Sequence, residues 1–267
     1  MRLHTHIQRR RQIVLLGALA MAVVTAGPAY ADRLTDAEVK QLIEAVDNAR
    51  DRFEDQLDGK LKNSVIRSSK GEANVRQYLE DYQETVKNLK DRFTTEYSGS
   101  AEAQIVFQQA TSMHRFLEGY DKQIKGRSEF DHLATQLGKL AGAYGVSFPL
   151  TDGATARRYN DDEVAGMAEV VAKDAEQLKK AIDKDAGIPK GDRKAAKDDV
   201  DVLKKQAELV KSRVSDGKPA TAEARDLFTQ STRVGNFVGG RQLASSTTAA
   251  WGSLRAHLES LRVVFDK

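Results

Sequence analysis

Histidines are the side chains best suited to metal or acid–base chemistry in the body of this chain, and three lie beyond residue 31: His114, His132 and His257. Glu129 and His132 form a Glu-x-x-His pair, which would share one helix face. Di-iron carboxylate bundles need such a pair on each of two helices, and the sequence offers one. His114 and Glu118, four residues apart, would also share a face. We therefore expect no resident cofactor, with His114, Glu118, Glu129 and His132 as the alternative metal set.

Other common catalytic chemistry lacks its motif. The chain has no cysteine, which excludes disulfides, thiolate nucleophiles and thiolate metal sites. It has no Gly-x-Ser-x-Gly, no His-Glu-x-x-His, no P-loop and no dinucleotide-binding glycine motif. The acidic segment 183–194 fails as a calcium loop because Lys194 stands where a bidentate glutamate is required. The interpretation that we favour is a protein without enzymatic activity.

Tyrosines suggest a different kind of site in the first part of the chain. Aromatic rings hold neighbouring helices apart and bring hydroxyl groups that need hydrogen-bond partners. A groove or internal ligand site is therefore a hypothesis for Tyr78, Tyr82, Tyr120 and Tyr144. The alternative is that these tyrosines straddle core and surface without binding anything.

The elements that would position these residues have a helical period. Apolar residues recur at spacings of three and four from Val75 to Phe93, with charged residues between them, as in an amphipathic helix. Thr35 with Glu38 has the spacing of a capping box. The first part of the chain is thus predicted to form four helices, at about 36–62, 72–96, 100–119 and 128–144.

The second part of the chain repeats the first. Residues 101–119 match residues 222–240 at eight of nineteen positions without a gap, and residues 34–58 align with residues 159–183. We expect an all-α fold of two tandem up-down four-helix bundles related by internal duplication, at 32–145 and 159–267, with coiled-coil-like packing. The glycine- and proline-bearing stretch 146–158 is the expected linker. One continuous array of eight helices remains an alternative.

The N-terminus resembles an export signal. Four arginines precede the apolar run Ile13–Val24, and a small-residue motif ends at Ala31, as in a cleaved signal peptide spanning 1–31. An uncleaved anchor and a twin-arginine signal at Arg10 and Arg11 are alternatives. Without this leader the chain holds 38 basic and 39 acidic residues, a balance that gives no electrostatic basis for nucleic-acid binding.

These observations predict a periplasmic or secreted protein with no membrane span after signal cleavage. Its expected function is that of a non-enzymatic helical binding or scaffold module, whose partner would be an unknown protein of the cell envelope. The alternative is a helical bundle that holds a small ligand, a metal or haem between its helices.

Overall fold

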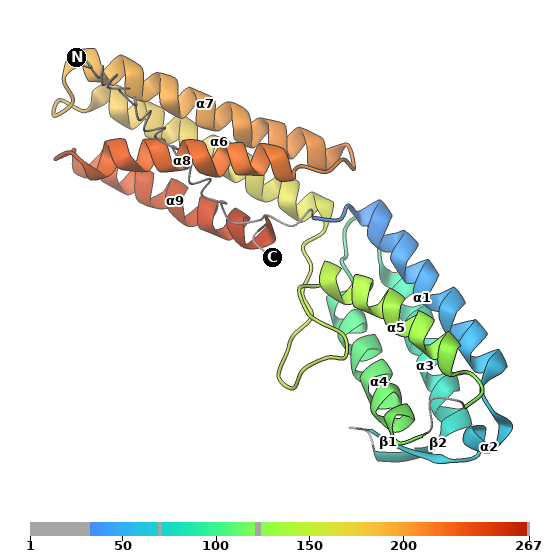
Figure 1. The fold of residues 1–267 in the computed structure, drawn as a ribbon. Coiled ribbons are helices and arrows are strands. Elements are labelled where there is room, and N and C mark those ends of the chain that lie inside the picture. Colours follow the sequence, from blue (N-terminus) through green and yellow to red (C-terminus); the bar gives the residue numbers. More distant parts are fainter. Residues whose placement is uncertain (1–32, 69–70, 121–123, 266–267) are drawn as a thin grey trace, which may run out of the picture.

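The computed structural model describes residues 33–68, 71–120 and 124–265 (Figure 1). Within these ranges the chain forms nine α-helices and one two-stranded antiparallel hairpin. The predicted helical class is therefore confirmed. The expected signal peptide, residues 1–31, lies outside the described residues. None of the described helices is both long and apolar enough to span a membrane.

The first half of the molecule comprises five helices and the hairpin. Its four long helices close a ring in chain order: α1 packs against α3 and α5, and α4 packs against α3 and α5. The apolar residues on their inner faces form one continuous core. The elements are α1 (Asp36–Gln56), α2 (Gly59–Lys62), β1 (Val65–Ser68), β2 (Gly71–Asn74), α3 (Val75–Arg92), α4 (Ser100–Glu118) and α5 (Arg127–Ala143).

The hairpin was not predicted from the sequence. The helix expected over 36–62 ends at Gln56, and Asp58 starts the short helix α2 by accepting a hydrogen bond from the Lys60 amide at 2.7 Å. β-branched residues then favour a strand over a helix, and Ile66 is fully buried against the core. The prediction of one unbroken first helix was therefore wrong at residues 57–58, where the chain leaves the helix before α2 begins.

The second half is built from four long helices. α6 packs against α7 and α9, and α8 packs against the same two helices, so this ring also closes in chain order. Its inner faces form a second, separate core that contains more alanine than the first. The helices are α6 (Asp161–Lys184), α7 (Lys190–Ser215), α8 (Thr221–Gly239) and α9 (Ser245–Phe265).

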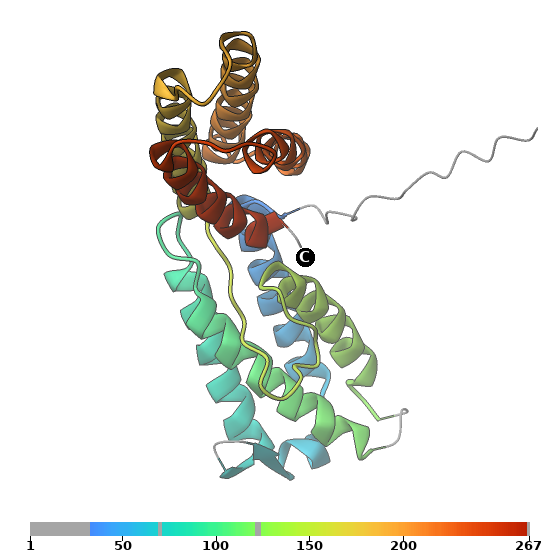
Figure 2. The same cartoon turned by 90° about the vertical axis from the view of Figure 1, so that its left-hand side faces the viewer.

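The connecting segment, residues 144–160, joins α5 to α6 and contains neither helix nor strand. It is more than a spacer, because Leu150 and Ala156 are buried in the core of the first half. Figures 1 and 2 show it as a long loop that runs beside α4 before it reaches α6. The stretch 146–158, expected as a linker, therefore extends the packing of the first half.

Candidate functional site

The N-termini of α1 and α6 meet where the two halves join. The Asp36 Oδ2 accepts a hydrogen bond from the Asp161 amide at 2.9 Å, and the Asp161 Oδ2 accepts one from the Asp36 amide at 3.0 Å. Each carboxylate thus caps the first turn of the other helix. The partial positive charge at a helix N-terminus favours such an anion.

Two buried arginines complete this junction cluster, which we define as Arg33, Asp36, Arg158 and Asp161. The Arg33 Nη1 lies 2.6 Å from the Asp161 Oδ1, and the Arg158 Nη2 lies 2.7 Å from the Asp36 Oδ1. The arginine side chains are only 8% and 3% exposed. Burial, together with the nearby guanidinium of Arg158, lowers the pKa of Arg33, while Asp161 acts against that shift. The cluster holds two positive and two negative charges, so its formal net charge is zero.

The same arginines also bind backbone groups in a reciprocal way. The Arg33 Nη2 donates to the carbonyl of Tyr159 at 2.9 Å, and the Arg158 Nη2 donates to the carbonyl of Leu34 at 2.8 Å. The backbone amide of Arg33 donates to the hydroxyl group of Thr221 at the start of α8 (3.4 Å), and the backbone amide of Arg158 donates to the hydroxyl group of Ser100 at the start of α4 (3.1 Å). Residues 125 positions apart in the chain, such as 33 and 158, therefore exchange roles across the junction.

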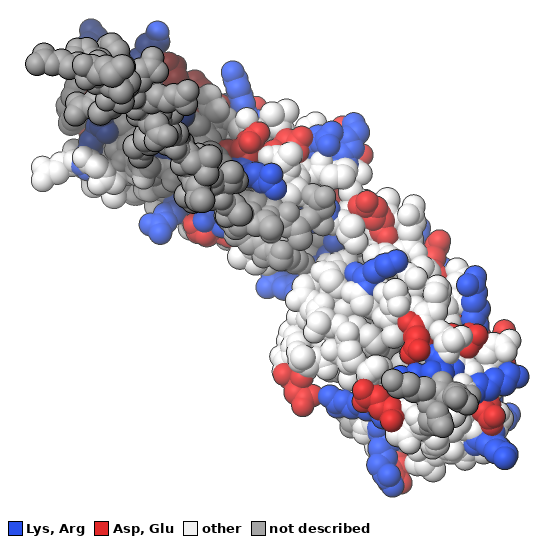
Figure 3. Space-filling model, in the orientation of Figure 1, with Lys and Arg blue, Asp and Glu red and all other residues white. Residues whose placement is uncertain are grey.

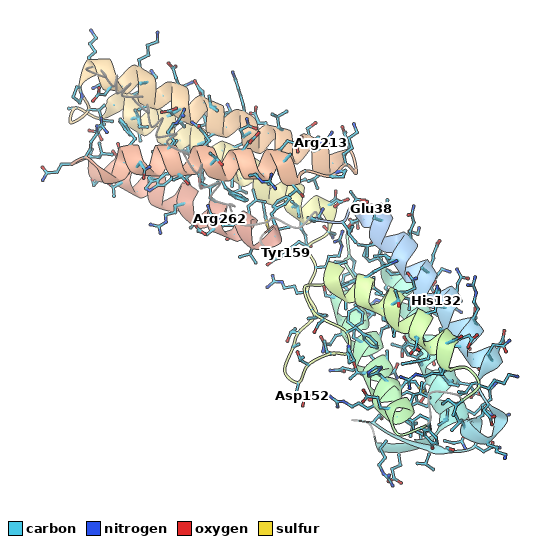
Figure 4. All side chains as sticks on the ribbon, viewed as in Figure 1. Glu38, His132, Asp152, Tyr159, Arg213 and Arg262 are labelled. Carbon is cyan, nitrogen blue, oxygen red and sulfur yellow. The ribbon has the colours of Figure 1, made fainter. Side chains whose placement is uncertain are left out.

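Capping boxes fix both helix starts next to the cluster. Thr35 and Glu38 cap α1, as the sequence predicted, and Asn160 and Glu163 cap α6 in the same manner. Figure 4 places the labelled Glu38 and Tyr159 at this meeting point. The junction is thus held by side chains whose own backbone is already fixed.

A polar pocket of about 420 Å³ lies between α4 and the connecting segment. Gln104 holds the segment in place: its Nε2 donates to the Ala154 carbonyl at 3.2 Å and its Oε1 accepts from the Ala156 amide at 2.6 Å. The Thr111 hydroxyl accepts from the Leu150 amide at 2.8 Å. These bonds form the wall of the pocket.

The remaining lining groups of this pocket face outward. Arg115 and Asp152 form an exposed ion pair at 3.3 Å, and Asp152 lies on the outer part of the loop (Figure 4). Gln108, Ser112 and Thr155 add amide and hydroxyl groups. The pocket therefore offers hydrogen bonds to a small polar molecule.

The four candidate tyrosines do not converge on one site. Tyr78, Tyr82 and Tyr144 are buried in the core of the first half, and Tyr120 is exposed at the end of α4. The Tyr78 hydroxyl donates to the Gln109 carbonyl at 2.9 Å, and the Tyr144 hydroxyl donates to the Ser98 carbonyl at 2.7 Å. Their hydroxyl groups are therefore used inside the protein.

Tyr82 differs from these two tyrosines because its buried hydroxyl group has no hydrogen-bond partner among the described residues. Burial raises its pKa, and the positive charge of Arg50 acts against that shift. Tyr82 and Arg50 are both less than 5% exposed. The interior of the first half thus contains buried polar groups beside its apolar core.

The four candidate metal ligands form two pairs with different surroundings. The His114 Nε2 lies 3.3 Å from the Glu118 Oε1, and the His114 ring stacks on Phe130. Glu129 and His132 line a separate small pocket that includes a cationic arginine, Arg52. Within residues 33–68, 71–120 and 124–265 no three metal-ligating side chains are grouped closely enough to hold an ion.

Sequence reasoning missed the junction, although a signal for it was present. The heptapeptide Arg33–Val39 reads RLTDAEV and Arg158–Val164 reads RYNDDEV. The aligned segments 34–58 and 159–183 begin one residue after these arginines. The arginines extend the repeated motif by one residue and place a cation next to each of two predicted helix N-termini.

Comparison with family models, with curated proteins and with solved structures found no match to this chain. Charges are interspersed on the face shown in Figure 3, with no extended area of one sign.

Proposed function

We propose that this chain is an exported, non-enzymatic scaffold or binding module built from two four-helix units that arose by internal duplication. The reciprocal junction cluster is the observation that carries the proposal. A contact in which each side contributes the same groups is isologous, the geometry of a two-fold symmetric interface. Here it joins two parts of one chain and would present two related helical surfaces in a fixed relative placement.

Equivalent contacts within the two halves support the duplication. Two contacts of the first half recur 121 residues later: the edge-to-face pair Phe107–Tyr144 as Phe228–Phe265 (5.9 and 6.4 Å) and the ion pair Arg92–Glu102 as Arg213–Glu223 (2.5 and 3.3 Å). The positions of a third contact also recur with donor and acceptor exchanged, because the Tyr78 hydroxyl donates to the Gln109 carbonyl at 2.9 Å, whereas the Gln230 Nε2 donates to the Asp199 carbonyl at 2.8 Å. Recurring pairs of contacts are what an internal duplication would leave, and they support the proposal for that reason.

Spin-label distances would test the fixed placement. The chain lacks cysteine, so Lys139→Cys on α5 and Arg255→Cys on α9 create two unique labelling sites at exposed positions. We expect a single narrow distance distribution, which broadens in the Asp36→Ala, Asp161→Ala double variant. Asp162→Ala is the matched control, because Asp162 is exposed and the aligned residue is Ala37. A broad distribution in the unmodified junction would contradict the scaffold proposal.

Cell fractionation and crosslinking would test export and partner binding. N-terminal sequencing of the mature protein from the cell envelope should begin at Asp32 if Ala31 is the cleavage site. Crosslinking in intact cells should then recover an envelope protein with the parent chain and with Asp162→Ala. Recovery of no partner with crosslinkers of several lengths would count against the proposed function.

The pocket beside α4 supports the alternative function, binding of a small ligand. Its amide, hydroxyl and guanidinium groups suit a polar molecule, outside the helical core and not between the helices. Elemental analysis and an absorption spectrum of the purified protein would separate a metal or haem from an organic ligand. Native mass spectrometry would reveal an organic ligand, and Gln104→Ala should release it.

A further inference from the structure

The outer face of α7 carries a stripe of exposed residues at heptad spacing. α7 packs against α6 and α8, and its remaining face is exposed. Apolar side chains occur there every seven residues, at Ala195, Val202 and Leu209, and Val202 and Leu209 are 43% and 49% exposed. Positions separated by seven residues lie on one line along a helix, about 10 Å apart.

Two charged residues on this stripe form no ion pair with any described residue. Asp198 and Lys205 lie between the apolar positions and are exposed, and among the described residues neither forms an ion pair. They are also seven residues apart, which is too far for an ion pair within one helix.

The charges on both flanks of the stripe are already paired within the chain. Towards α6, Lys197 pairs with Asp183 at 2.6 Å and Lys204 with Glu176 at 3.1 Å. Towards α8, Arg213 pairs with Glu223 at 3.3 Å. The charges of Asp198 and Lys205 are thus available to a partner that lies along the stripe.

We propose that the α7 faces of two copies of this chain pack antiparallel, with the two-fold axis at Val202. In this register Val202 meets its own copy, and Ala195 meets Leu209, so that a small side chain accommodates a large one. Asp198 then lies one residue, about 1.5 Å along the helix axis, from the position opposite Lys205 of the second copy, within reach of the long lysine side chain, so that two equivalent ion pairs form. An axis midway between residues 203 and 204 would instead place Val202 opposite Lys205 and Leu209 opposite Asp198.

The second copy is favoured over an unrelated partner because the stripe is complementary to itself. An unrelated helix would need its own matching apolar and charged positions, whereas an antiparallel copy supplies them by symmetry. The proposal is independent of the proposed scaffold function, since it concerns the outer face of one helix and not the junction.

Disulfide crosslinking would test the contact and its direction in the full chain. Val202→Cys should form a disulfide-linked dimer, because residues on a two-fold axis bring their Cα atoms within the range of about 4.4–6.8 Å that a disulfide needs. A mixture of Ala195→Cys and Leu209→Cys should form the mixed dimer in preference to either homodimer. Val263→Cys on α9, 61% exposed, is the matched control and should stay monomeric.

Charge reversal would test the ion pairs by sedimentation velocity. Asp198→Lys or Lys205→Asp alone should weaken the dimer by about tenfold through like-charge contact, and the double reversal should restore affinity to within about twofold. A monomer at every concentration, crosslinking of Val263→Cys as strong as that of Val202→Cys, or homodimers of Ala195→Cys alone would each overturn the proposal. Helicity measured by circular dichroism shows whether each variant is folded.

Discussion

The first two long helices of each half are joined by different means. α6 and α7 are linked by four ion pairs along their length, whereas among the described residues one ion pair links α1 to α3. The first half instead buries Arg50 and two tyrosines near this contact. The two halves thus use different polar groups near this contact: a buried guanidinium and buried hydroxyl groups in the first half, and surface ion pairs in the second.

The shared aromatic pair offers the strongest test of this comparison. Phe107 is fully buried and Phe228 is 3% exposed. Phe107 packs edge-to-face on Tyr144, the residue that follows α5, and Phe228 packs edge-to-face on Phe265 at the end of α9. Phe107→Ala and Phe228→Ala should each lower the free energy of unfolding by about 3–5 kcal/mol, because each leaves a cavity. Urea denaturation followed by circular dichroism would measure both values.

Equal effects would support equivalent cores in the two halves. Val263→Ala, at an exposed position of α9, is the control and should change stability by no more than about 0.5 kcal/mol. A loss below about 1 kcal/mol in one half alone would break the comparison, because that half would then tolerate the cavity by rearranging.

The junction cluster should produce the next largest effect. Asp36→Ala leaves the buried Arg158 guanidinium without its carboxylate partner, and breaking a buried pair in this way costs about 3 kcal/mol or more. Asp161→Ala should cost less, because its side chain and that of Arg33 are more exposed, at 13% and 8%. Differential scanning calorimetry of both variants would measure this order.

Calorimetry would also report coupling between the halves. If the junction transmits stability, unfolding of the parent chain should occur in one transition and that of Asp36→Ala in two. One transition in both proteins, with an unchanged midpoint, would contradict a structural role for the cluster.

The sequence predicted the helices and the aligned core positions because burial imposes a helical period that is visible in one dimension. The hairpin at residues 65–74 escaped prediction since only its packing, through Ile66, makes it stable. The junction escaped for a different reason. A contact between residues 33 and 161 has no local periodicity, and its only trace was a short repeated motif that includes an arginine.

The candidate site shows the same limit. Tyr78 and Tyr82 lie in a helix, as the sequence predicted, whereas Tyr120 and Tyr144 lie just past the ends of α4 and α5. The sequence could not reveal that the hydroxyl groups of Tyr78 and Tyr144 donate hydrogen bonds to backbone carbonyls. Likewise, the glycines and Pro149 predicted an irregular linker at residues 146–158, and nothing local indicated that Gln104 would hold it against α4.

Tyr78 and Tyr82, one helical turn apart in α3, allow a test of the buried hydroxyl groups of the first half, with a smaller expected effect. Tyr78→Phe should lower the free energy of unfolding by about 1 kcal/mol, since it leaves a buried carbonyl without its hydroxyl donor. Tyr82→Phe should be neutral or stabilising, because its buried hydroxyl group has no partner among the described residues. Denaturation by urea would compare the two variants, and an equal loss in both would show that Tyr82 also makes a stabilising hydrogen bond.

Surface ion pairs should give the smallest effect, as a dependence of stability on pH. Hydrogen bonds from Lys173 and Lys211, with the charges of these lysines, lower the pKa of Glu169 to about 2 from an ordinary value of 4.5. Because the folded protein holds the carboxylate at the lower pKa, this stabilisation is complete above about pH 4.5 and is lost as the pH falls towards 2. Glu169→Gln should therefore be slightly less stable than the parent at pH 7, and the difference should shrink below pH 4.5.

The aligned Glu44 forms no ion pair among the described residues, so Glu44→Gln should leave the urea midpoint unchanged at both pH values. A pH-independent loss in Glu169→Gln would mean that side-chain packing, and not charge, explains its contribution.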